Sequence, residues 1–185
     1  MLLALVGVTG VGKSYYKEKI VENFNFEKVN TIRTREKRIG EENGKVGLFM
    51  SKQELENLKS KGKIAYDFEV FGGTYAYLKE EIFSKKNMVF EMHYTTIKEW
   101  KKVRPDIKTI YILPSNIEIA KEKTRKRNLS KEKEEERIKE IEEHYNKFMS
   151  NENLRNMFDY IVYNNYNEES EKEIFQLVKK MLNEK

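Results

Sequence analysis

Glycines, a lysine and a serine near the start of the chain have the types and spacing of a phosphate-binding loop. Residues 7–14 read G-V-T-G-V-G-K-S, which fits G-x-x-x-x-G-K-S, and an apolar run over 2–6 stands directly before them. Glycines let backbone N–H groups close around phosphate oxygens, the lysine reaches the outer phosphates, and the serine hydroxyl ligates Mg²⁺. The pattern predicts a site for a nucleoside triphosphate with Mg²⁺, formed by Gly7, Val8, Thr9, Gly10, Val11, Gly12, Lys13 and Ser14.

The arginines of the chain are few and gathered in two short segments. Only eight of its 36 basic residues are arginine, and six of these are Arg33, Arg35, Arg38, Arg125, Arg127 and Arg137. An arginine presents a rigid two-pronged donor that matches a phosphate, whereas a lysine supplies a point charge. The two clusters therefore indicate two phosphate-facing sites.

The composition narrows the class of protein. The chain has 185 residues, no cysteine and a net charge of +5. One domain is expected at this length, and the lack of cysteine excludes disulfides and thiol chemistry, as is usual in the cytoplasm. The first apolar run is too short for a signal peptide or a membrane span. The lysines are scattered without interleaved aromatic residues, so nucleic acid is not expected as a partner. The oligomeric state is left open.

The two histidines, His93 and His144, lie far apart in the sequence and share no metal-ligand spacing. Because no cysteine accompanies them, a structural zinc site is not expected. His144 falls in a highly charged stretch, where a solvated side chain is the expected state.

Four apolar runs, bounded by polar segments, are separated by helical patterns. Continuous buried strands that alternate with helices are typical of a parallel sheet covered on both faces, so the fold class is α/β. Helix starts are predicted at two capping boxes, one from Ser51 to Glu54 and one from Ser115 to Glu118, and a last helix over 168–182. The predicted strands lie over 2–6, 88–90, 109–113 and 160–163.

Two stretches interrupt this alternation. Short β-like pieces with several glycines over 45–77 predict a small antiparallel insertion. The highly charged stretch over 121–147 is predicted to be helical, either as a solvated hairpin or as a lid that closes over substrate. Because a phosphate-binding loop is present, the lid is favoured, and it would bring Arg125, Arg127 and Arg137 onto a phosphate chain.

The longest motif in the chain resembles one of the guanylate kinase family. Residues 34–44 read T-R-E-K-R-I-G-E-E-N-G, which is similar to T-R-x-x-R-x-G-E-x-x-G in that family. Segments 70–75, 109–115 and 158–164 also resemble family segments, so the similarity runs across nearly the whole chain. It implies one domain over 1–185 with the three-layer P-loop NTPase fold. The implied parts are a parallel-sheet core (1–33, 83–120 and 151–185), a small β-rich acceptor-binding insertion (about 34–82) and a helical lid (about 121–150).

The resemblance implies ATP-dependent phosphoryl transfer to GMP, giving GDP and ADP, with Mg²⁺ as a cofactor. In the family, the two arginines of the long motif hold the phosphate of GMP, and the glutamate supports them. Lid arginines act on the transferred group, and an asparagine near the chain end lies by the donor adenine. The implied catalytic residues are Lys13, Arg127 and Arg137, with Ser14 on the metal. Arg125 and Asn164 join the ATP site, and the substrate-binding residues are Thr31, Arg35, Arg38, Glu41, Tyr75, Asp67 and Glu91.

Some of these assignments rest on substitutes for family residues. Thr31 stands where the family has a serine that helps to read guanine. Asp67 is adjacent to Tyr66, which replaces a guanine-reading glutamate. Residues 91–93 read E-M-H where the family has D-x-D, so Glu91 keeps one acid. At the end of an apolar strand, Glu91 is placed to hold a water bound to Mg²⁺.

These departures from the family sequence fall at the expected acceptor-binding site and not at the expected ATP-binding site. Gly47 also falls where the family has a tyrosine on the acceptor phosphate. Two alternatives are therefore open: a P-loop kinase of another nucleotide or small phosphorylated acceptor, and a catalytically silent guanylate-kinase-like interaction module. The complete phosphate-binding loop and the lid arginines argue against the silent module, because such modules need no donor site.

Overall fold

The structure, a computed structural model, describes residues 1–37, 41–44, 47–70, 72–127 and 129–184. Its main sheet has the order β2-β7-β1-β8-β9, and every neighbouring pair is parallel. Four of its strands confirm the predicted apolar runs. The edge strand β2 escapes sequence prediction because it has three residues, two of them charged. The strands are β1 (Leu2–Gly7), β2 (Phe26–Lys28), β7 (Asn87–Glu91), β8 (Lys108–Pro114) and β9 (Tyr160–Asn164).

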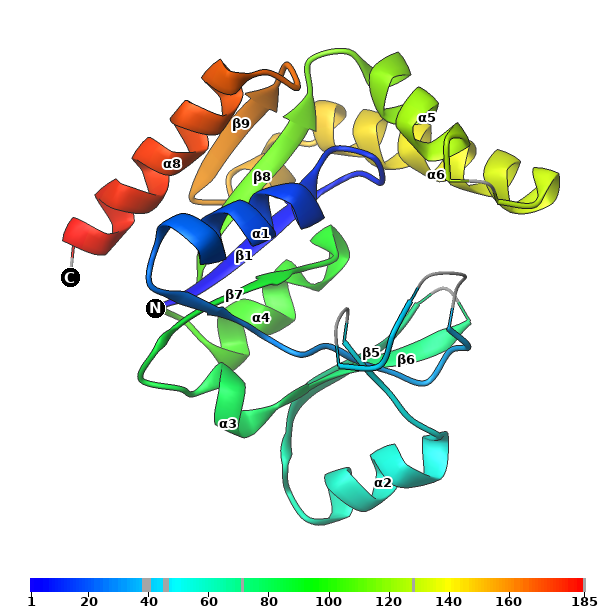
Figure 1. The fold of residues 1–185 in the computed structure, drawn as a ribbon, viewed down its shortest axis with the longest axis vertical. Helices are drawn as coiled ribbons and strands as arrows, with labels where there is room; N and C mark the ends of the chain where they lie inside the picture. The colour runs from blue at the N-terminus through cyan, green and yellow to red at the C-terminus, as the bar shows by residue number, and fades with distance from the viewer. Residues whose placement is uncertain (38–40, 45–46, 71, 128, 185) are drawn as a thin grey trace.

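Alternate residues of β1 enter two separate apolar cores on the two faces of this sheet. The helices that cover the faces are α1 (Lys13–Asn23), α4 (Ile97–Val103), α6 (Lys131–Ser150) and α8 (Glu168–Asn183). Leu5 packs in the core formed with α1 and α8. Ala4 packs in the other core, with Trp100 of α4 and Phe148 of α6. Helices thus lie on both faces, which confirms the predicted α/β fold with a parallel-sheet core (Figure 1).

A second, smaller sheet forms the insertion. Its order is β4-β3-β6-β5, in which β6 runs antiparallel to β3 and β5, while β3 and β4 are parallel. Its first strand begins at Ile32, slightly before the expected boundary at about 34. In Figure 1 the insertion lies on the opposite side of the core from α8. Its elements are β3 (Ile32–Arg33), β4 (Leu48–Phe49), α2 (Lys52–Ser60), β5 (Ile64–Val70) and β6 (Gly73–Leu78), and α3 (Lys79–Ile82) leads back to β7.

The starts of two helices test the predicted caps. The capping box of Ser51 and Glu54 is present at the start of α2. At the start of α5 (Ile117–Arg125), however, the cap is Asn116, whose side chain accepts a hydrogen bond from the Glu118 backbone N–H. The predicted cap at Ser115 is therefore wrong by one residue, because asparagine is at least as good a cap as serine and stands next to the helix.

The predicted charged stretch forms a helical hairpin of α5 and α6. Lys121 of α5 forms ion pairs with Glu118 at 2.6 Å and with Glu142 of α6 at 2.5 Å, which ties the two helices together. Near the end of α6, Phe148 stacks on Tyr111 of β8 with ring centroids 3.6 Å apart. The hairpin is therefore anchored to the core at its C-terminal end, and α7 (Glu152–Arg155) follows it. Across the described ranges, no helix combines the length and apolarity needed to cross a membrane.

Candidate functional site

The loop between β1 and α1 requires glycine at defined places. A Cβ atom on Gly7 would lie 2.3 Å from the Ile112 carbonyl oxygen, and one on Gly10 would lie 2.3 Å from that of Ala120. Both glycines, like Gly12, also have positive φ angles. The Lys13 ammonium is held inside this turn, where it donates hydrogen bonds of 2.8 Å to the Gly7 carbonyl and 2.9 Å to that of Val8. The loop thus holds a lysine cation at the N-terminus of α1.

Glu91, the last residue of β7, lies beside this loop. Its carboxylate accepts a hydrogen bond of 2.7 Å from Lys17 Nζ, and the Ser14 hydroxyl lies close enough to act on its pKa. Burial raises the pKa of Glu91, but the charges of Lys17 and Lys13 and these contacts outweigh burial and hold that pKa below its usual value. An ionised carboxylate beside a hydroxyl offers the oxygen ligands that Mg²⁺ prefers. Ser14 and Glu91 therefore fit the expected Mg²⁺ site.

A pocket of about 690 Å³ opens next to the loop, between the start of α1 and the loop from β9 to α8. Asn164 lines it, but its side chain is engaged internally: Nδ2 donates to the Val11 carbonyl at 2.9 Å, and Oδ1 accepts from the Tyr16 hydroxyl at 2.8 Å and the Tyr166 N–H at 2.7 Å. Asn164 thus positions the phosphate-binding loop. The pocket itself has the place and size for the base of a bound triphosphate.

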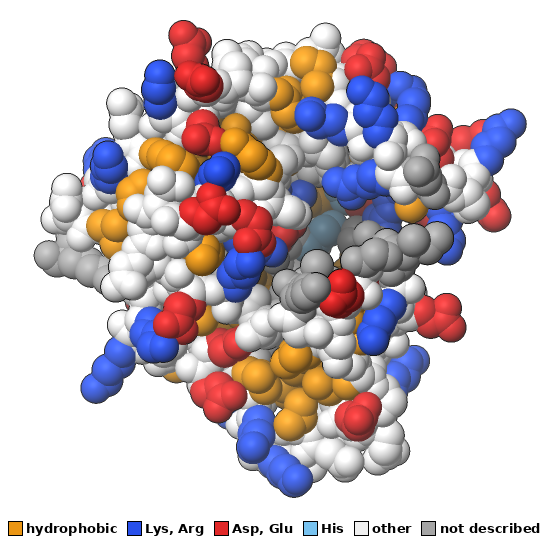
Figure 2. Space-filling view, viewed as in Figure 1, with side chains coloured by type: hydrophobic (Ala, Val, Ile, Leu, Met, Phe, Trp, Pro, Cys, Tyr) orange, Lys and Arg blue, Asp and Glu red, His pale blue; other side chains and the backbone are white. Residues whose placement is uncertain are grey.

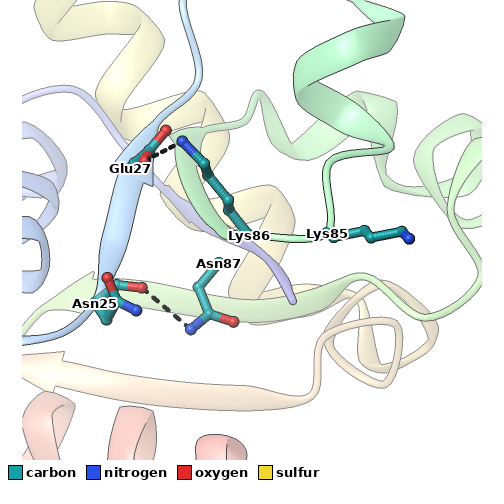
Figure 3. Close-up of a pocket in the computed structure, with 5 residues that line it drawn as sticks. All are labelled: Asn25, Glu27, Lys85, Lys86 and Asn87. Atoms are coloured by element: carbon teal, nitrogen blue, oxygen red, sulfur yellow. Dashed lines mark hydrogen bonds and ion pairs between the residues drawn. The ribbon is translucent and has the colours of Figure 1, made fainter.

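A second pocket, of about 280 Å³, lies at the opposite edge of the sheet, where β7 begins (Figure 3). Four of its five lining residues are paired with one another: Lys86 with Glu27 at 2.6 Å, and the Asn87 side chain with the Asn25 carbonyl at 3.1 Å. Because these side chains bind one another, the pocket does not present a set of polar groups that could act together on a ligand.

The insertion contributes a pre-oriented arginine. Arg35 donates to both carboxylate oxygens of Glu41, at 2.7 and 2.8 Å, and its Nε donates to the Tyr75 hydroxyl at 3.0 Å. The hydrogen bond to Glu41 is the main cause that raises the pKa of Arg35, so the guanidinium is always charged. The structure therefore brings together three of the residues expected at the acceptor phosphate. Arg38, expected beside them, lies outside the described residues.

Arg33 is a residue of this region that sequence reasoning gave no individual role. Its Nη1 lies 1.9 Å from where a Cβ atom on Gly47 would be, so the guanidinium occupies the space above that glycine. The guanidinium carbon is also 5.8 Å from the centre of the Tyr75 ring, next to the site of Arg35. The position where the family has a tyrosine is thus filled by an arginine from the neighbouring strand. Its place among the clustered arginines was the signal available in the sequence.

The two faces of the β5–β6 pair show where the Asp67 side chain lies. Phe68 stacks with Tyr75 and Tyr77, at 5.7 and 6.5 Å between ring centroids, and forms an aromatic face on one side of the sheet. Asp67 pairs in register with Ala76, which packs in the core under α2, and its carboxylate forms a 2.7 Å ion pair with Lys59 of α2. The expectation of Asp67 at the acceptor base is therefore not supported, because its side chain is directed to the opposite side of the sheet.

Tyr77 connects the insertion to the loop. Its ring packs on Phe90 of β7 with ring centroids 5.4 Å apart, one residue before Glu91. Burial raises the pKa of Tyr77, and the charges of Arg33 and Glu91 act on it in opposite directions. Thr31, whose hydroxyl is expected to read a base, lies close enough to Tyr77 to act on this pKa as well. Figure 2 shows a cleft between the α5–α6 hairpin and the insertion, with lysine and arginine side chains around it and a histidine inside. Cationic side chains therefore gather around one cleft between these two parts of the chain.

Of the three arginines expected to act on a phosphate chain, Arg137 is partly buried, whereas Arg125 and Arg127 are exposed. Burial lowers the pKa of Lys13, and the charge of Arg127 adds to this effect. Arg137 donates to Glu140 at 2.5 Å, and its charge is one of those that lower the pKa of His93, after burial and His144. Arg125 is exposed in the last turn of α5.

Lys17 is a further residue of the site that sequence reasoning missed. It lies one helical turn after Lys13 on α1, so the two side chains share a face of the helix. That spacing was the signal in the sequence, and the partner, Glu91, stands at the end of a different strand.

Comparison with known proteins gives one consistent family. A model described as guanylate kinase matches residues 1–183. The guanylate kinase of Carboxydothermus hydrogenoformans is 29% identical over 137 residues, which span 71% of this chain and 67% of that protein. The guanylate kinase of Wolbachia from Brugia malayi is 27% identical over 97% of this chain and 92% of its own. The crystal structure of guanylate kinase from Anaplasma phagocytophilum superposes with a TM-score of 0.71, at 21% identity, over 97% of this chain and 85% of that one.

Proposed function

The chain belongs to the guanylate kinase family, and on this premise we propose that it transfers the terminal phosphoryl group of ATP to GMP, giving GDP and ADP. One observation supports this proposal above the others. The Lys13 ammonium in its glycine loop and the Arg35 guanidinium on Glu41 flank a single cleft, linked through Tyr77. Phosphoryl transfer needs two phosphate groups held in line and little covalent help from the protein, which is what two such sites provide.

On the donor side, Lys13 and the loop N–H groups hold the outer phosphates of ATP. To do so, the ammonium exchanges its hydrogen bonds to the Gly7 and Val8 carbonyls for phosphate oxygens. Ser14 and Glu91 would hold the Mg²⁺, directly or through water. When bound, Mg²⁺ neutralises charge that develops on the transferred group. Lys17 keeps Glu91 ionised and in place.

On the acceptor side, Arg35 binds the phosphate of GMP, with Glu41 orienting its guanidinium and Tyr75 adding a hydroxyl. A two-pronged arginine fixes both the position and the rotation of a phosphate. Arg38 shares this role, as the family motif implies. Arg33 supplies a further cation where a tyrosine is absent, because Gly47 leaves room for its guanidinium.

The lid completes the site when nucleotides bind. Arg127 and Arg137 neutralise the group in transfer, and closure of α5 and α6 excludes water that would otherwise accept the phosphoryl group. Arg137 first has to exchange Glu140 for phosphate, since it is paired with that carboxylate in the free protein. Arg125 adds a more distant charge at the end of α5.

The base of the acceptor is tested by the release of ADP in a coupled assay, with GMP, dGMP, AMP, UMP and CMP offered in turn. Turnover with GMP and dGMP, and with none of the others, is expected if the site reads guanine. Turnover with another nucleotide alone would reassign the acceptor while leaving the kinase chemistry in place. Absence of turnover with all five would contradict the proposal.

We also place this reaction in purine nucleotide metabolism of the cytoplasm, consistent with a chain that has no cysteine.

Replacing Gly47 with alanine is expected to raise KM for GMP by about tenfold, the effect of one weakened charged hydrogen bond. The new Cβ atom would displace the Arg33 guanidinium, whose Nη1 lies 1.9 Å from its position, and would also lie 2.5 Å from the Thr31 carbonyl oxygen. KM for ATP should stay within a factor of about two, because the donor site lies across the cleft. Steady-state kinetics with each substrate varied in turn measures both values.

Gly44→Ala is the matched control for this variant. Gly44 also has a positive φ, of 84°, but a Cβ atom there would meet nothing within 4 Å. It therefore places an alanine at a positive φ in the same region without moving Arg33. Equal increases of KM for GMP in both variants would show that strain alone is responsible and would refute the role of Arg33.

A further inference from the structure

Both histidines of the chain come together in the cleft. His93 follows β7, His144 lies on α6, and their ring centroids are 5.3 Å apart. One ligand atom from each of His93, Glu140 and His144 lies within 4.8 Å of the others. The fold thus brings the two histidines, which share no metal-ligand spacing in the sequence, close to each other and to a glutamate. We propose that these three residues bind a divalent transition-metal ion of the Zn²⁺ type, which links α6 to the loop after β7.

The donor set selects the class of metal. Two imidazole nitrogens and one carboxylate oxygen form a common three-residue set for Zn²⁺, with the fourth position left for water or another ligand. Mg²⁺ prefers oxygen ligands in octahedral geometry, so this site differs in kind from the Mg²⁺ site at Ser14 and Glu91. In a zinc site the metal lies about 2.0–2.2 Å from each ligand atom, so small side-chain rotations have to draw the three ligand atoms closer.

Glu140 and His144 are presented together by the helix. They are four residues apart on α6, so their side chains lie on one face, and Glu140 Oε1 is 3.6 Å from His144 Nδ1. Arg137 binds the other carboxylate oxygen, Oε2, at 2.5 Å. Glu140 can therefore keep its arginine on one oxygen and offer Oε1 to a metal.

His93 is oriented from the other side of the cleft. Its Nδ1 lies 2.6 Å from the Thr95 hydroxyl oxygen, and its Nε2 is buried. Histidines that bind metals generally engage their second ring nitrogen in such a hydrogen bond, which fixes the ring and raises its basicity. Thr95 is therefore placed as a positioning residue for this ligand, with Nε2 as the ligand atom.

The surroundings set a limit on affinity. The charges of Lys13 and Arg137 act on His93, while Glu143 and Lys147 act on His144 in opposite directions. The cations oppose a metal ion, and the carboxylates of Glu140 and Glu143 offset them only in part. Binding should therefore be weaker than in structural zinc sites with thiolate ligands. Because Arg137 is on the same helix, an ion held here would also restrain the lid in the absence of nucleotide.

Titration of the full chain with Co²⁺ tests the proposal. The protein is purified without a histidine tag, and ATP is left out because it chelates the metal. One equivalent of Co²⁺ should bind and show the intense visible absorption bands of a four- or five-coordinate ion with nitrogen ligands, and Zn²⁺ should displace it. No saturable binding up to about 1 mM metal, the range of non-specific affinity, would overturn the proposal.

Variants locate the ion. His144→Gln and Glu140→Gln should each weaken binding by at least about tenfold, and Thr95→Val by a similar factor through His93. Glu143→Gln is the matched control, since Glu143 lies on the same helix with its side chain 63% exposed and outside the cluster. Circular dichroism confirms that each variant is folded. Unchanged affinity in His144→Gln, or equal weakening in Glu143→Gln, would refute the site. Since the readout is metal binding, neither result depends on the proposed kinase activity.

Discussion

Lys13→Ala is expected to reduce kcat by about 10²–10³-fold, the effect of removing one preorganised charge from a developing phosphate centre. In the free protein the ammonium is held by two backbone carbonyls of the loop, so it is already in place when ATP arrives. The loss should appear in kcat more than in KM for GMP, because the residue acts on the donor phosphates. Steady-state kinetics at saturating ATP, GMP and Mg²⁺ measures it.

Lys86→Ala provides the control for this variant. It removes the same charge from the pocket at the opposite edge of the sheet, where Lys86 pairs with the exposed Glu27. Its kcat should be unchanged, since surface ion pairs contribute little. A Lys13→Ala enzyme that retained more than a tenth of the normal kcat would contradict the assignment of the loop as the donor site.

Arg35→Ala should lower kcat/KM for GMP by about 10²-fold, because a charged two-pronged contact to phosphate contributes roughly 2–3 kcal/mol. The variant also leaves the Glu41 carboxylate, normally bound by Arg35, facing the acceptor phosphate. KM for ATP should change little. The measurement is initial-rate kinetics with GMP varied at fixed saturating ATP.

The double variant Arg35→Ala with Glu41→Gln separates the two causes of this loss. Without Arg35, the negative charge of Glu41 opposes the acceptor phosphate. Replacing Glu41 with glutamine in the Arg35→Ala variant should therefore restore part of the lost activity. Glu41→Gln alone should cost about tenfold, since the guanidinium remains but is held less firmly. An Arg35→Ala variant that weakened ATP binding and left GMP binding intact would contradict the assignment of Arg35 to the phosphate of GMP.

The core was predictable from the sequence because its signals are local. A strand buried on both faces is a continuous apolar run, and the phosphate-binding loop is contiguous in the chain. The edge strand β2 gives no such signal, since it has three residues and only Phe26 is buried. At the start of α5, two good cap residues are adjacent, and the pattern does not choose between Ser115 and Asn116.

The acceptor side depends on contacts between segments that are distant in the sequence. Which face of β5 carries Asp67 follows from its register with β6, and the ion pair with Lys59 depends on the packing of α2. Arg33 fills the space over Gly47 because β3 and β4 pair side by side. The two histidines meet because α6 folds back over the end of β7. No spacing of residues in the sequence indicates any of these three contacts.

The central claim, phosphoryl transfer from ATP to GMP, is tested most directly by product analysis. The protein is incubated with ATP, GMP and Mg²⁺, and the nucleotides are separated by ion-exchange chromatography over time. We expect one GDP to form for each ADP, and no ADP to form when GMP is omitted. Formation of ADP without GDP would show that water is the acceptor and would contradict this claim.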